Sequence, residues 1–340
     1  MSDTFDRCRV ALVLAGGNAL GAYQAGVYEA LHECGVEPAW IVGTSIGAIN
    51  GAVIAGSAPD ERIANLRELW RPAARQPTWP DWSALLSDRW RRTGEAMGTL
   101  LGGRSGFFGP AWSALVPGLR HDAIYDAQPL AVSLSSLVDL DRLNHGPMRF
   151  TAMAVDLDSG EDAIFDTQHH AVTIDHLRAS AALPPAFPPV PIDGRMYVDG
   201  GLSANLPLDP VLAAPGETAL LCIAVDLLPR SSPRPRSLGE MIGRAQDLMF
   251  GIQSRRSVER WQAAYEAGGS HAHHRVTLVR LTYADQACEV AGKAMDFSPD
   301  SVRKRWDLGL TAGRELVRRI GGGGFVDAVP GLKVASTDGV

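Results

Sequence analysis

The chain has 340 residues, 46% of them hydrophobic, and a formal net charge of -6. This composition excludes a largely disordered protein, and the length suits one large domain or one domain with an extension. An acidic net charge provides no general attraction to nucleic acid, so we expect no nucleic-acid partner. The four cysteines form no C-x-x-C pair, so the sequence predicts neither a zinc site nor a disulfide framework and favours a reducing compartment.

The N-terminal residues mix acidic and basic side chains and lack the basic-then-apolar layout of a signal peptide. Residues 10–28 carry no charge, but they are interrupted by Gly16, Gly17, Asn18, Gly21 and Gln24, which argues against a transmembrane helix. We therefore expect a cytoplasmic protein, with peripheral contact to a membrane left open.

The first elements follow the pattern of an α/β domain. Residues 10–14 form an apolar run typical of a parallel strand buried on both faces. A helix is predicted over residues 19–34, with Glu29, His32 and Glu33 on its polar face and Gly35 placed to end it. A second strand is predicted at residues 40–42 and a second helix at residues 46–55. Together these elements begin an α/β domain with a right-handed βαβ unit.

Residues 43–47 read Gly-Thr-Ser-Ile-Gly, the G-x-S-x-G pattern of a nucleophile elbow. In such an elbow a sharp strand-to-helix turn exposes a serine hydroxyl, and the flanking glycines relieve crowding. The context predicts Ser45 as a catalytic nucleophile, supported by Gly43 and Gly47. A structural Gly-Ser turn is the alternative.

The turn between the first strand and the first helix contains Gly16, Gly17, Asn18 and Gly21. A dinucleotide fingerprint would need glycine in place of Asn18 and an acidic residue closing the second strand, so no cofactor is expected. Successive backbone N–H groups before a helix can instead form an oxyanion hole, and asparagine tolerates a positive φ. A turn needed only for packing is the remaining alternative.

Residues 70–125 are rich in tryptophan, proline and glycine, which favours an irregular or helical insertion over regular sheet. Its aromatic side chains could form an apolar wall for an acyl chain, or a satellite cluster that holds down a long connection. They are Trp70, Trp79, Trp82, Trp90, Phe107, Phe108 and Trp112.

Regular elements then resume. Residues 130–137 and 174–183 are predicted helices, and residues 149–157 and 163–165 are predicted to form a hairpin. A short strand at residues 196–198 delivers Asp199 into the turn of Gly200 and Gly201. Asp199 could be an Asx-turn residue that caps its own loop or a functional carboxylate.

The C-terminal part begins with a strand at residues 219–226 and a linker at residues 231–236. A helix with an apolar face, a strand at residues 276–283 and a final helix starting at Pro299 follow. The apolar face of the first of these helices consists of Met241, Ala245, Leu248 and Ile252.

Two clusters of side chains in this part have alternative interpretations. The histidines 271, 273 and 274 lie in a small-residue setting that favours a solvated loop over a metal site. The cations of the last helix are typical of an exposed helix surface, although they could also approach anionic lipid. They are Arg303, Lys304, Arg305, Arg314, Arg318 and Arg319.

Three motifs stand in one order: the glycine turn from residue 16 to 21, the elbow from residue 43 to 47, and Asp199-Gly200-Gly201. This order resembles the patatin-like phospholipase family, whose members combine a glycine-rich oxyanion loop, an elbow serine and the aspartate of a D-G-G/A motif. Two positions depart from the family pattern. Asn18 stands where a third glycine is usual, and Leu20 stands where arginine or lysine is common.

The resemblance covers about residues 9–212, and Asn205-Leu206-Pro207 also matches it. It implies a three-layer α/β fold with a central, mainly parallel sheet, helices on both faces, and a helical or mixed C-terminal extension. The implied organisation is a catalytic core at residues 8–212 with an insertion at 70–125, an extension at 213–325, and a flexible tail at 326–340.

The implied chemistry is hydrolysis of lipid acyl esters. Asp199 would accept the Ser45 proton during attack on the ester carbonyl, N–H groups around Gly16, Gly17 and Asn18 would hold the oxyanion, and water would hydrolyse the acyl-enzyme. No metal or cofactor is required. Asp199 should be partly buried, because desolvation raises a carboxyl pKa. Both residues end predicted strands, so neighbouring parallel strands could present them at one sheet edge.

Two other functions are compatible with the sequence. One is an α/β-hydrolase esterase with a Ser-Asp-His triad, for which His271, His273 or His274 would follow in the proper chain order. The other is a catalytically silent lipid-binding or scaffold protein with the same fold.

Overall fold

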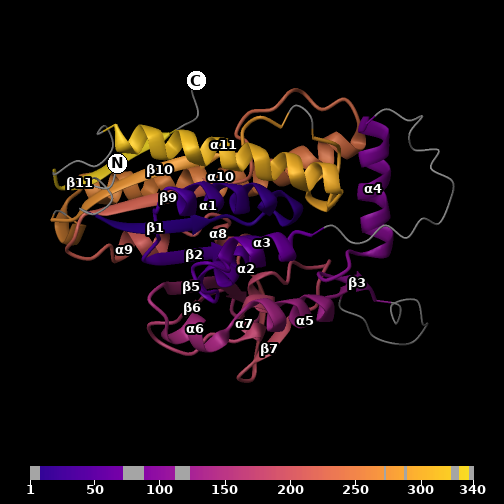
Figure 1. Ribbon diagram of the computed structural model, residues 1–340, viewed down its shortest axis with the longest axis horizontal. Coiled ribbons are helices and arrows are strands. Elements are labelled where there is room, and N and C mark those ends of the chain that lie inside the picture. The colour runs from indigo at the N-terminus through magenta and orange to yellow at the C-terminus, as the bar shows by residue number, and fades with distance from the viewer. Residues whose placement is uncertain are drawn as a thin grey trace.

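A computed structural model describes residues 8–71, 88–111, 123–271, 273–286, 289–322 and 329–336. Within these ranges, nine strands form one sheet in the order β11-β10-β9-β1-β2-β5-β8-β7, with β6 paired to β5 (Figure 1). The strands are β1 (Arg9–Leu14), β2 (Trp40–Thr44), β5 (Arg149–Asp156), β6 (Asp162–Asp166), β7 (Val190–Ile192), β8 (Arg195–Asp199), β9 (Leu220–Asp226), β10 (Arg275–Thr282) and β11 (Gly331–Ser336). A separate two-stranded sheet pairs β3 (Gly109–Pro110) with β4 (Tyr125–Asp126).

The helices surround this sheet. They are α1 (Ala22–Glu33), α2 (Ile46–Ala55), α3 (Arg62–Leu69), α4 (Asp88–Gly102), α5 (Gln128–Leu137), α6 (Leu140–His145), α7 (Ile174–Ser180), α8 (Gly201–Ala204), α9 (Asp209–Ala213), α10 (Leu238–Glu266) and α11 (Pro299–Gly321). A short 3-10 helix, η2 (Asn18–Gly21), precedes α1, and another, η6 (Lys293–Met295), lies between β10 and α11.

The three-layer arrangement follows from alternation along the buried strands. In β1, Val10, Leu12 and Leu14 join the apolar cluster that contains side chains of α1, α2, α7 and α11. Ala11 and Val13 point the other way, into a cluster with side chains of α9 and α10. Successive side chains of a strand face opposite sides, so an uninterrupted apolar strand requires helices on both faces. This confirms the predicted fold class.

Six neighbouring strands, β11, β10, β9, β1, β2 and β5, run parallel to one another. The predicted hairpin of β5 and β6 is present as an antiparallel pair. Residues on both sides of the predicted boundary at residue 212 contribute to the sheet, because β9 pairs with β1. The prediction of a flexible tail from residue 326 is wrong for residues 331–336, which form β11 along β10.

Helix α11 lies against α1, and the two helices run side by side in Figure 1. Glycines permit this close approach: a β-carbon at position 26 would lie 2.0 Å from the Trp306 carbonyl oxygen, and one at position 309 would lie 2.0 Å from the Tyr23 carbonyl oxygen. The prediction of Glu29 on a polar face of α1 is wrong. Glu29 is buried and binds Arg67 and the indole N–H of Trp306, because α11 covers this side of α1.

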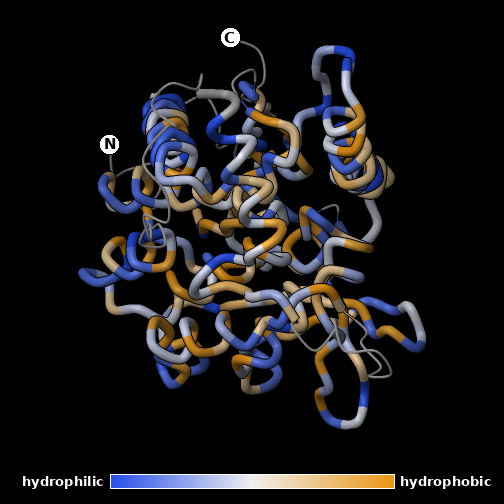
Figure 2. The backbone as a smooth tube through the Cα atoms, turned by 90° about the vertical axis from the view of Figure 1, so that its right-hand side faces the viewer, coloured by the Kyte–Doolittle hydropathy of each residue, from blue (hydrophilic) through white to orange (hydrophobic). Residues whose placement is uncertain are grey.

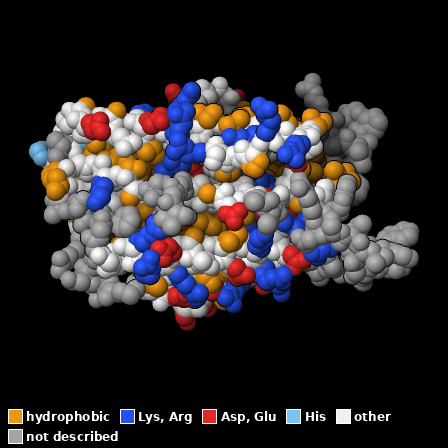
Figure 3. All heavy atoms as spheres, turned by 90° about the horizontal axis from the view of Figure 1, so that it is seen from above, with side chains coloured by type: hydrophobic (Ala, Val, Ile, Leu, Met, Phe, Trp, Pro, Cys, Tyr) orange, Lys and Arg blue, Asp and Glu red, His pale blue; other side chains and the backbone are white. Residues whose placement is uncertain are grey.

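The cations of α11 are largely paired with acidic side chains. Arg314 binds Glu33, Arg318 and Arg319 bind Glu315, and Arg303 binds Asp300. Figure 3, seen from the side on which α11 lies, shows basic and acidic side chains interspersed rather than gathered in one basic patch. Arg305 is completely buried. This helix is therefore not a free basic surface.

The apolar face predicted for the helix after the linker exists in α10, but its first half is open to solvent. Met241 is 54% exposed and Leu248 is 41% exposed. The second half is different, because Val258 and Tyr265 are buried against the sheet. In the described ranges, no helix is both long enough and apolar enough to cross a lipid bilayer.

Candidate active site

The elbow forms where β2 passes into α2. Ser45 lies between them with φ 55° and ψ -125°, a left-handed conformation that is uncommon for a non-glycine residue. Such strain persists only where surrounding structure imposes it, and it occurs most often at functional sites. The sequence prediction of a sharp strand-to-helix turn at Ser45 agrees with this geometry.

The two glycines of the elbow are required by close backbone contacts. A β-carbon at position 43 would lie 2.5 Å from the backbone of Gly47 and Ala48, and one at position 47 would lie 2.2 Å from the Leu14 carbonyl oxygen. Side chains at these positions would force α2 away from the sheet. Gly43 and Gly47 therefore shape the turn, and neither lines the pocket described below.

Asp199 reaches the elbow at the end of β8, a strand that runs antiparallel to its neighbour β5 and not parallel as predicted. The prediction of two neighbouring parallel strands is wrong, since β5 lies between β2 and β8 and β8 runs antiparallel to β5. The register explains why the residues still meet. Thr44 pairs with Met153, and the next residue, Ala154, pairs with Asp199. The end of β8 therefore lies level with the end of β2.

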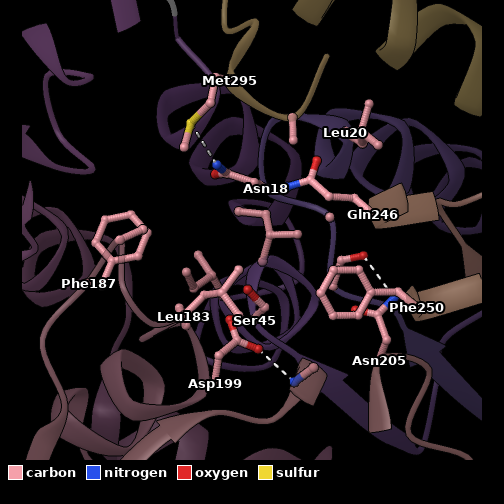
Figure 4. A pocket seen from close by; sticks show the side chains of 18 of the residues that line it. Asn18, Leu20, Ser45, Leu183, Phe187, Asp199, Asn205, Gln246, Phe250 and Met295 are labelled. Atoms are coloured by element: carbon pink, nitrogen blue, oxygen red, sulfur yellow. Dashed lines mark hydrogen bonds between the residues drawn. The ribbon is translucent and has the colours of Figure 1, made fainter. Parts of the chain in front are cut away.

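The Asp199 side chain is buried, with only 3% of its surface exposed. Burial raises the pKa of its carboxyl to about 7, although the hydrogen bond from the Gly201 N–H and the nearby Ser45 hydroxyl act in the opposite direction. The Gly201 N–H donates to Oδ1 over 2.7 Å, which is an Asx turn. Asp199 thus caps its own loop, and its carboxyl lies close to the Ser45 side chain (Figure 4).

The glycine turn provides free N–H groups, but not all of those expected. The Gly16 N–H donates to the Asn205 carbonyl oxygen over 3.0 Å, so the prediction of Gly16 as an oxyanion donor is wrong. Within the described residues, the N–H groups of Gly17 and Asn18 have no backbone acceptor. Asn18 has φ 51°, as its tolerance of the left-handed region allows. The candidate donors are therefore Gly17 and Asn18.

Polar side chains from distant segments hold the elbow and the glycine turn together. The Ser45 N–H donates to the Ser180 hydroxyl oxygen over 3.1 Å, and the Thr44 hydroxyl donates to the Ala204 carbonyl oxygen over 2.9 Å. Asn205 Nδ2 donates to the Gly16 carbonyl oxygen over 3.3 Å. Sequence analysis assigned no role to Ser180, because a buried serine inside a predicted helix gives no local signal.

A buried network stabilises the far side of the same turn. Gln24 Nε2 donates to the Ala15 carbonyl oxygen over 2.7 Å, and Asn50 Nδ2 donates to the Gly21 carbonyl oxygen over 3.0 Å. The Trp70 indole N–H donates to Asn50 Oδ1 over 2.9 Å. Gly21 itself does not line the pocket; a β-carbon there would lie 2.5 Å from the Ile46 side chain. Polar residues inside apolar helices were the available sequence signal for this network.

Arg305 of α11 anchors the glycine turn. Position 20, where the family commonly has arginine or lysine, is a leucine in this chain. Leu20 is fully buried, and the Arg305 guanidinium donates to the Ala19 carbonyl oxygen over 3.1 Å. Arg305 also donates to the Asp296 carbonyl oxygen over 2.7 Å and binds Glu289 through two hydrogen bonds of 2.8 and 2.7 Å. The C-terminal part of the chain therefore fixes the loop that precedes α1.

The elbow, the turn and Asp199 open into one pocket with a cavity volume of about 140 Å³. Figure 4 shows Ser45 and Asp199 together, with Leu183 and Phe187 on one side and Phe250 on the other. Most of the lining side chains are apolar. The larger ones are Leu20, Ile46, Ile49, Phe107, Phe108, Leu130, Leu183, Phe187, Leu228, Phe250 and Met295, and four alanines complete the set, Ala127, Ala181, Ala186 and Ala294.

The pocket also shows which predicted residues come together. Gly16, Gly17, Asn18, Ser45, Asp199 and Gly201 line it, whereas Gly200 lies behind it, where a β-carbon would be 2.5 Å from the Met153 carbonyl oxygen. The insertion contributes Phe107 and Phe108 to the wall, and Trp70 packs behind them against Phe107. Trp79, Trp82 and Trp112 lie outside the described residues, as does the Trp90 side chain.

The predicted alternatives that use histidine find no support in the pocket. Among the residues that the structure describes, no histidine lines it. His271 stacks on Tyr265, with ring centroids 4.9 Å apart, and His274 Nδ1 lies 3.0 Å from the Gly216 carbonyl oxygen. Within the same described ranges, no three histidine, cysteine, aspartate or glutamate side chains converge as a metal site would require.

Comparison with known proteins places this geometry in a family. One relative is an uncharacterized NTE family protein of Mycobacterium tuberculosis (strain H37Rv), which is 28% identical over 258 residues. The match covers 74% of this chain and 60% of the relative. A patatin-like phospholipase domain-containing protein of Caenorhabditis elegans is 25% identical over 203 residues, covering 59% of this chain and 12% of that protein.

Among solved structures, VipD from Legionella pneumophila aligns with a TM-score of 0.45 at 14% identity, covering 92% of this chain and 67% of that chain. A family model described as patatin phospholipase matches residues 244–320. The model described as patatin-like phospholipase matches residues 12–212, which include the glycine turn, the elbow and Asp199. The chain belongs to the patatin-like phospholipase family.

Proposed function

We propose that the chain is a serine-dependent lipid acyl-ester hydrolase in which Ser45 and Asp199 act as a catalytic dyad. The observation that carries the proposal is that the strained elbow serine and a buried carboxyl with a raised pKa lie together in one apolar pocket. Family membership supports hydrolysis of lipid as the reaction class. The chain covers 60% of the length of the mycobacterial relative.

The reaction proceeds in two steps, acylation of Ser45 and hydrolysis of the acyl-enzyme. The Ser45 oxygen attacks the ester carbonyl carbon while its proton passes to the Asp199 carboxylate, and the N–H groups of Gly17 and Asn18 donate to the oxyanion. The tetrahedral intermediate collapses, the carbon–oxygen bond of the alcohol breaks, and protonated Asp199 gives its proton to the leaving oxygen. Water then attacks the acyl-enzyme by the same route, releasing the fatty acid and restoring Ser45.

The burial of Asp199 suits this role. An ordinary carboxylate is a weak base near neutral pH, but a carboxyl with a pKa of about 7 can accept a proton and return it at similar cost. The apolar walls formed by Phe107, Phe108 and Phe187 favour an acyl chain over a polar substituent. The substrate class is therefore an acyl ester with a hydrocarbon chain, and a lipid is the natural source.

Hydrolysis of p-nitrophenyl esters by purified variants tests the dyad. Ser45→Ala and Asp199→Asn should each lower kcat/KM by about a thousandfold or more. Ser203→Ala is the matched control, because this serine is exposed on α8 a few residues beyond Asp199. It should retain full activity.

Replacement of His271, His273 and His274 by alanine separates the dyad from the triad alternative. Each variant should keep most of the activity, because these histidines are absent from the lining of the pocket. A folded histidine variant as inactive as Ser45→Ala would support a triad hydrolase. A wild-type protein that hydrolyses no ester of any chain length would support the silent lipid-binding alternative.

A further inference from the structure

The first half of α10 exposes a stripe of large apolar side chains. Leu238 is 77% exposed, Met241 54%, Ile242 56% and Met249 57%, and Leu248 of the same stripe is also exposed. We call these five residues the α10 stripe. With 3.6 residues per turn, positions 238, 241, 242, 248 and 249 fall on one side of the helix. An apolar side of this length, left open on a folded protein, indicates an interaction surface.

The stripe lies next to the mouth of the pocket. Gln246 and Phe250 of the same helix line the pocket, and at 3.6 residues per turn they follow the stripe by about a quarter turn. Asp247, about half a turn from the stripe, is buried and binds Lys293 over 2.6 Å. Asp247 also lines the pocket, so the helix presents its exposed apolar side to solvent and its other side to the pocket and the protein interior.

The surrounding elements place the start of this helix near α4, at one end of the molecule (Figure 1). A β-carbon at position 239 would lie 3.0 Å from the Ala291 side chain, and one at position 292 would lie 4.0 Å from the Ala96 side chain of α4. The start of α10 and α4 therefore flank the same loop. Figure 2 faces this end and shows apolar stretches interleaved with hydrophilic ones along the chain.

Exposed cations accompany the stripe. Arg230, Arg234 and Arg236 lie exposed on the linker that leads into α10. Arg244 on the helix donates to the carbonyl oxygens of Pro229 and Arg230 over 3.2 and 2.7 Å, which fastens the linker beside the stripe. Residues 230–249 contain four arginines against Glu240 and Asp247. Since Asp247 is paired with Lys293 inside the protein, the outward charge of this segment is positive.

We propose that the α10 stripe and its linker arginines dock the protein on an anionic lipid surface, with the mouth of the pocket facing the lipid. An apolar helix side flanked by cations is the pattern of a helix that lies in a membrane interface, with the apolar side chains among the acyl chains and the cations at the head groups. Docking in this orientation lets an acyl chain move from the bilayer to Ser45 without crossing bulk water. The proposal rests on the proposed function for its substrate, but not for the binding itself.

A second copy of the chain is the competing occupant of the stripe. Charge argues against it, because pairing two stripes would bring two sets of four arginines together. An anionic surface instead complements all four. The two occupants differ in what they predict for the oligomeric state and for the dependence of binding on lipid charge.

The test is co-sedimentation of the Ser45→Ala protein with vesicles, because this variant binds lipid without hydrolysing it. We expect binding to vesicles of phosphatidylcholine with phosphatidylglycerol and weak binding to phosphatidylcholine alone. Adding Ile242→Asp and Met249→Asp should lower the affinity for the anionic vesicles by roughly tenfold or more. Ile164→Asp on β6 is the matched control, because Ile164 is also exposed and should leave binding unchanged.

The linker arginines are tested separately. Arg234→Gln and Arg236→Gln should lower binding to anionic vesicles by about fivefold per arginine and leave binding to neutral vesicles unchanged. Equal vesicle binding by wild-type and Ile242→Asp/Met249→Asp proteins would overturn the proposal. So would a wild-type dimer, seen by light scattering, that these two substitutions convert to a monomer.

Activity measurements distinguish failure of docking from failure of the proposed function. With Ser45 intact, Ile242→Asp/Met249→Asp should hydrolyse a soluble p-nitrophenyl ester at the wild-type rate and release less fatty acid from anionic vesicles. Absence of hydrolysis by the wild-type protein on both substrates would contradict the proposed function, while the vesicle-binding result would still stand. Equal hydrolysis of vesicles by both proteins would contradict the docking proposal.

Discussion

Helices α10 and α11 are both long, both lie in the C-terminal part of the chain, and both carry an apolar side. The apolar side of α11 is buried against the protein, whereas that of the first half of α10 is open to solvent. Leu316, Val317 and Ile320 of α11 are almost completely inaccessible, whereas Leu238 and Ile242 of α10 are more than half exposed. The same amphipathic pattern thus serves packing in one helix and an open surface in the other.

The difference lies in small residues and buried charge, not in hydrophobicity. Gly309 and Gly313 let α11 approach α1 until backbones touch, and Arg305 carries its charge into the interior, where Glu289 neutralises it. The exposed half of α10 has Gly243, but a β-carbon there would meet nothing within 4 Å. An apolar periodicity therefore predicts that a helix has an apolar side. Whether another part of the chain packs on that side depends on the small and charged residues at the remaining positions of the helix.

The largest effect should come from the buried charge of α11. Replacing Arg305 by methionine leaves Glu289 with Arg92 as its other cation and takes the guanidinium N–H from the Ala19 carbonyl oxygen, and breaking a buried pair in this way costs about 3–5 kcal/mol. If the protein remains folded, kcat should fall because the glycine turn loses its anchor. Arg305→Lys should restore part of both losses. Denaturant unfolding and ester hydrolysis measure them.

The matched replacement on the exposed linker is Arg236→Met, which should change the free energy of unfolding by no more than about 0.5 kcal/mol. Similar losses for Arg305→Met and Arg236→Met would contradict the contrast between the two regions.

Asp199 is buried, unlike the side chains of the α10 stripe, and its burial should affect how the rate of ester hydrolysis depends on pH. Because the carboxyl has a pKa of about 7, the rate should fall about tenfold per pH unit below that value and level off above it. The pH dependence of kcat/KM on a soluble ester measures this. A rate that stays constant from pH 5 to 8 would show that Asp199 is not the base.

Stability should change with pH in the opposite direction. Protonated Asp199 is the form that burial favours, so its contribution to stability is present below the ordinary carboxyl pKa and is lost as pH rises through about 7. Asp199→Asn removes this dependence. The variant should therefore gain thermal midpoint relative to wild type at pH 8, and the gain should shrink at pH 5.

Glycine replacements compare the two helices directly. Gly309→Ala places a β-carbon 2.0 Å from the Tyr23 carbonyl oxygen, and the overpacking should cost about 1–3 kcal/mol. Gly243→Ala meets open space and should stabilise α10 by about 0.5–1 kcal/mol, the difference in helix propensity. Chemical denaturation of both variants gives the sign of each change. A Gly309→Ala variant that is stabilised, as Gly243→Ala is expected to be, would mean that α11 packs less tightly on α1 than the geometry indicates.

The smallest effect is expected from the α10 stripe itself. Met249→Ala removes an exposed side chain and should alter the free energy of unfolding by less than about 0.5 kcal/mol. Leu316→Ala, the counterpart on α11, should cost about 2–5 kcal/mol because it leaves a cavity. A large loss for Met249→Ala would mean that the stripe is covered in the folded protein.

Sequence analysis predicted the local parts of the site well. The elbow and the glycine turn each lie within a few residues, where glycine and serine patterns have a direct steric meaning. The partners of these loops could not be predicted in the same way. Gly16 donates to Asn205 and Ala19 accepts from Arg305, and both contacts join distant segments through the fold. The direction of β8 was also missed, since a three-residue apolar run carries no information about parallel or antiparallel pairing.

Covalent labelling of Ser45 tests the central claim most directly. A fluorophosphonate with a long alkyl chain reacts only with an activated serine, and peptide mass spectrometry locates the adduct. The account predicts one adduct on Ser45 in the wild-type protein, none in Ser45→Ala, and strongly slowed labelling in Asp199→Asn. Labelling of another serine, or labelling of Asp199→Asn at the wild-type rate, would contradict it.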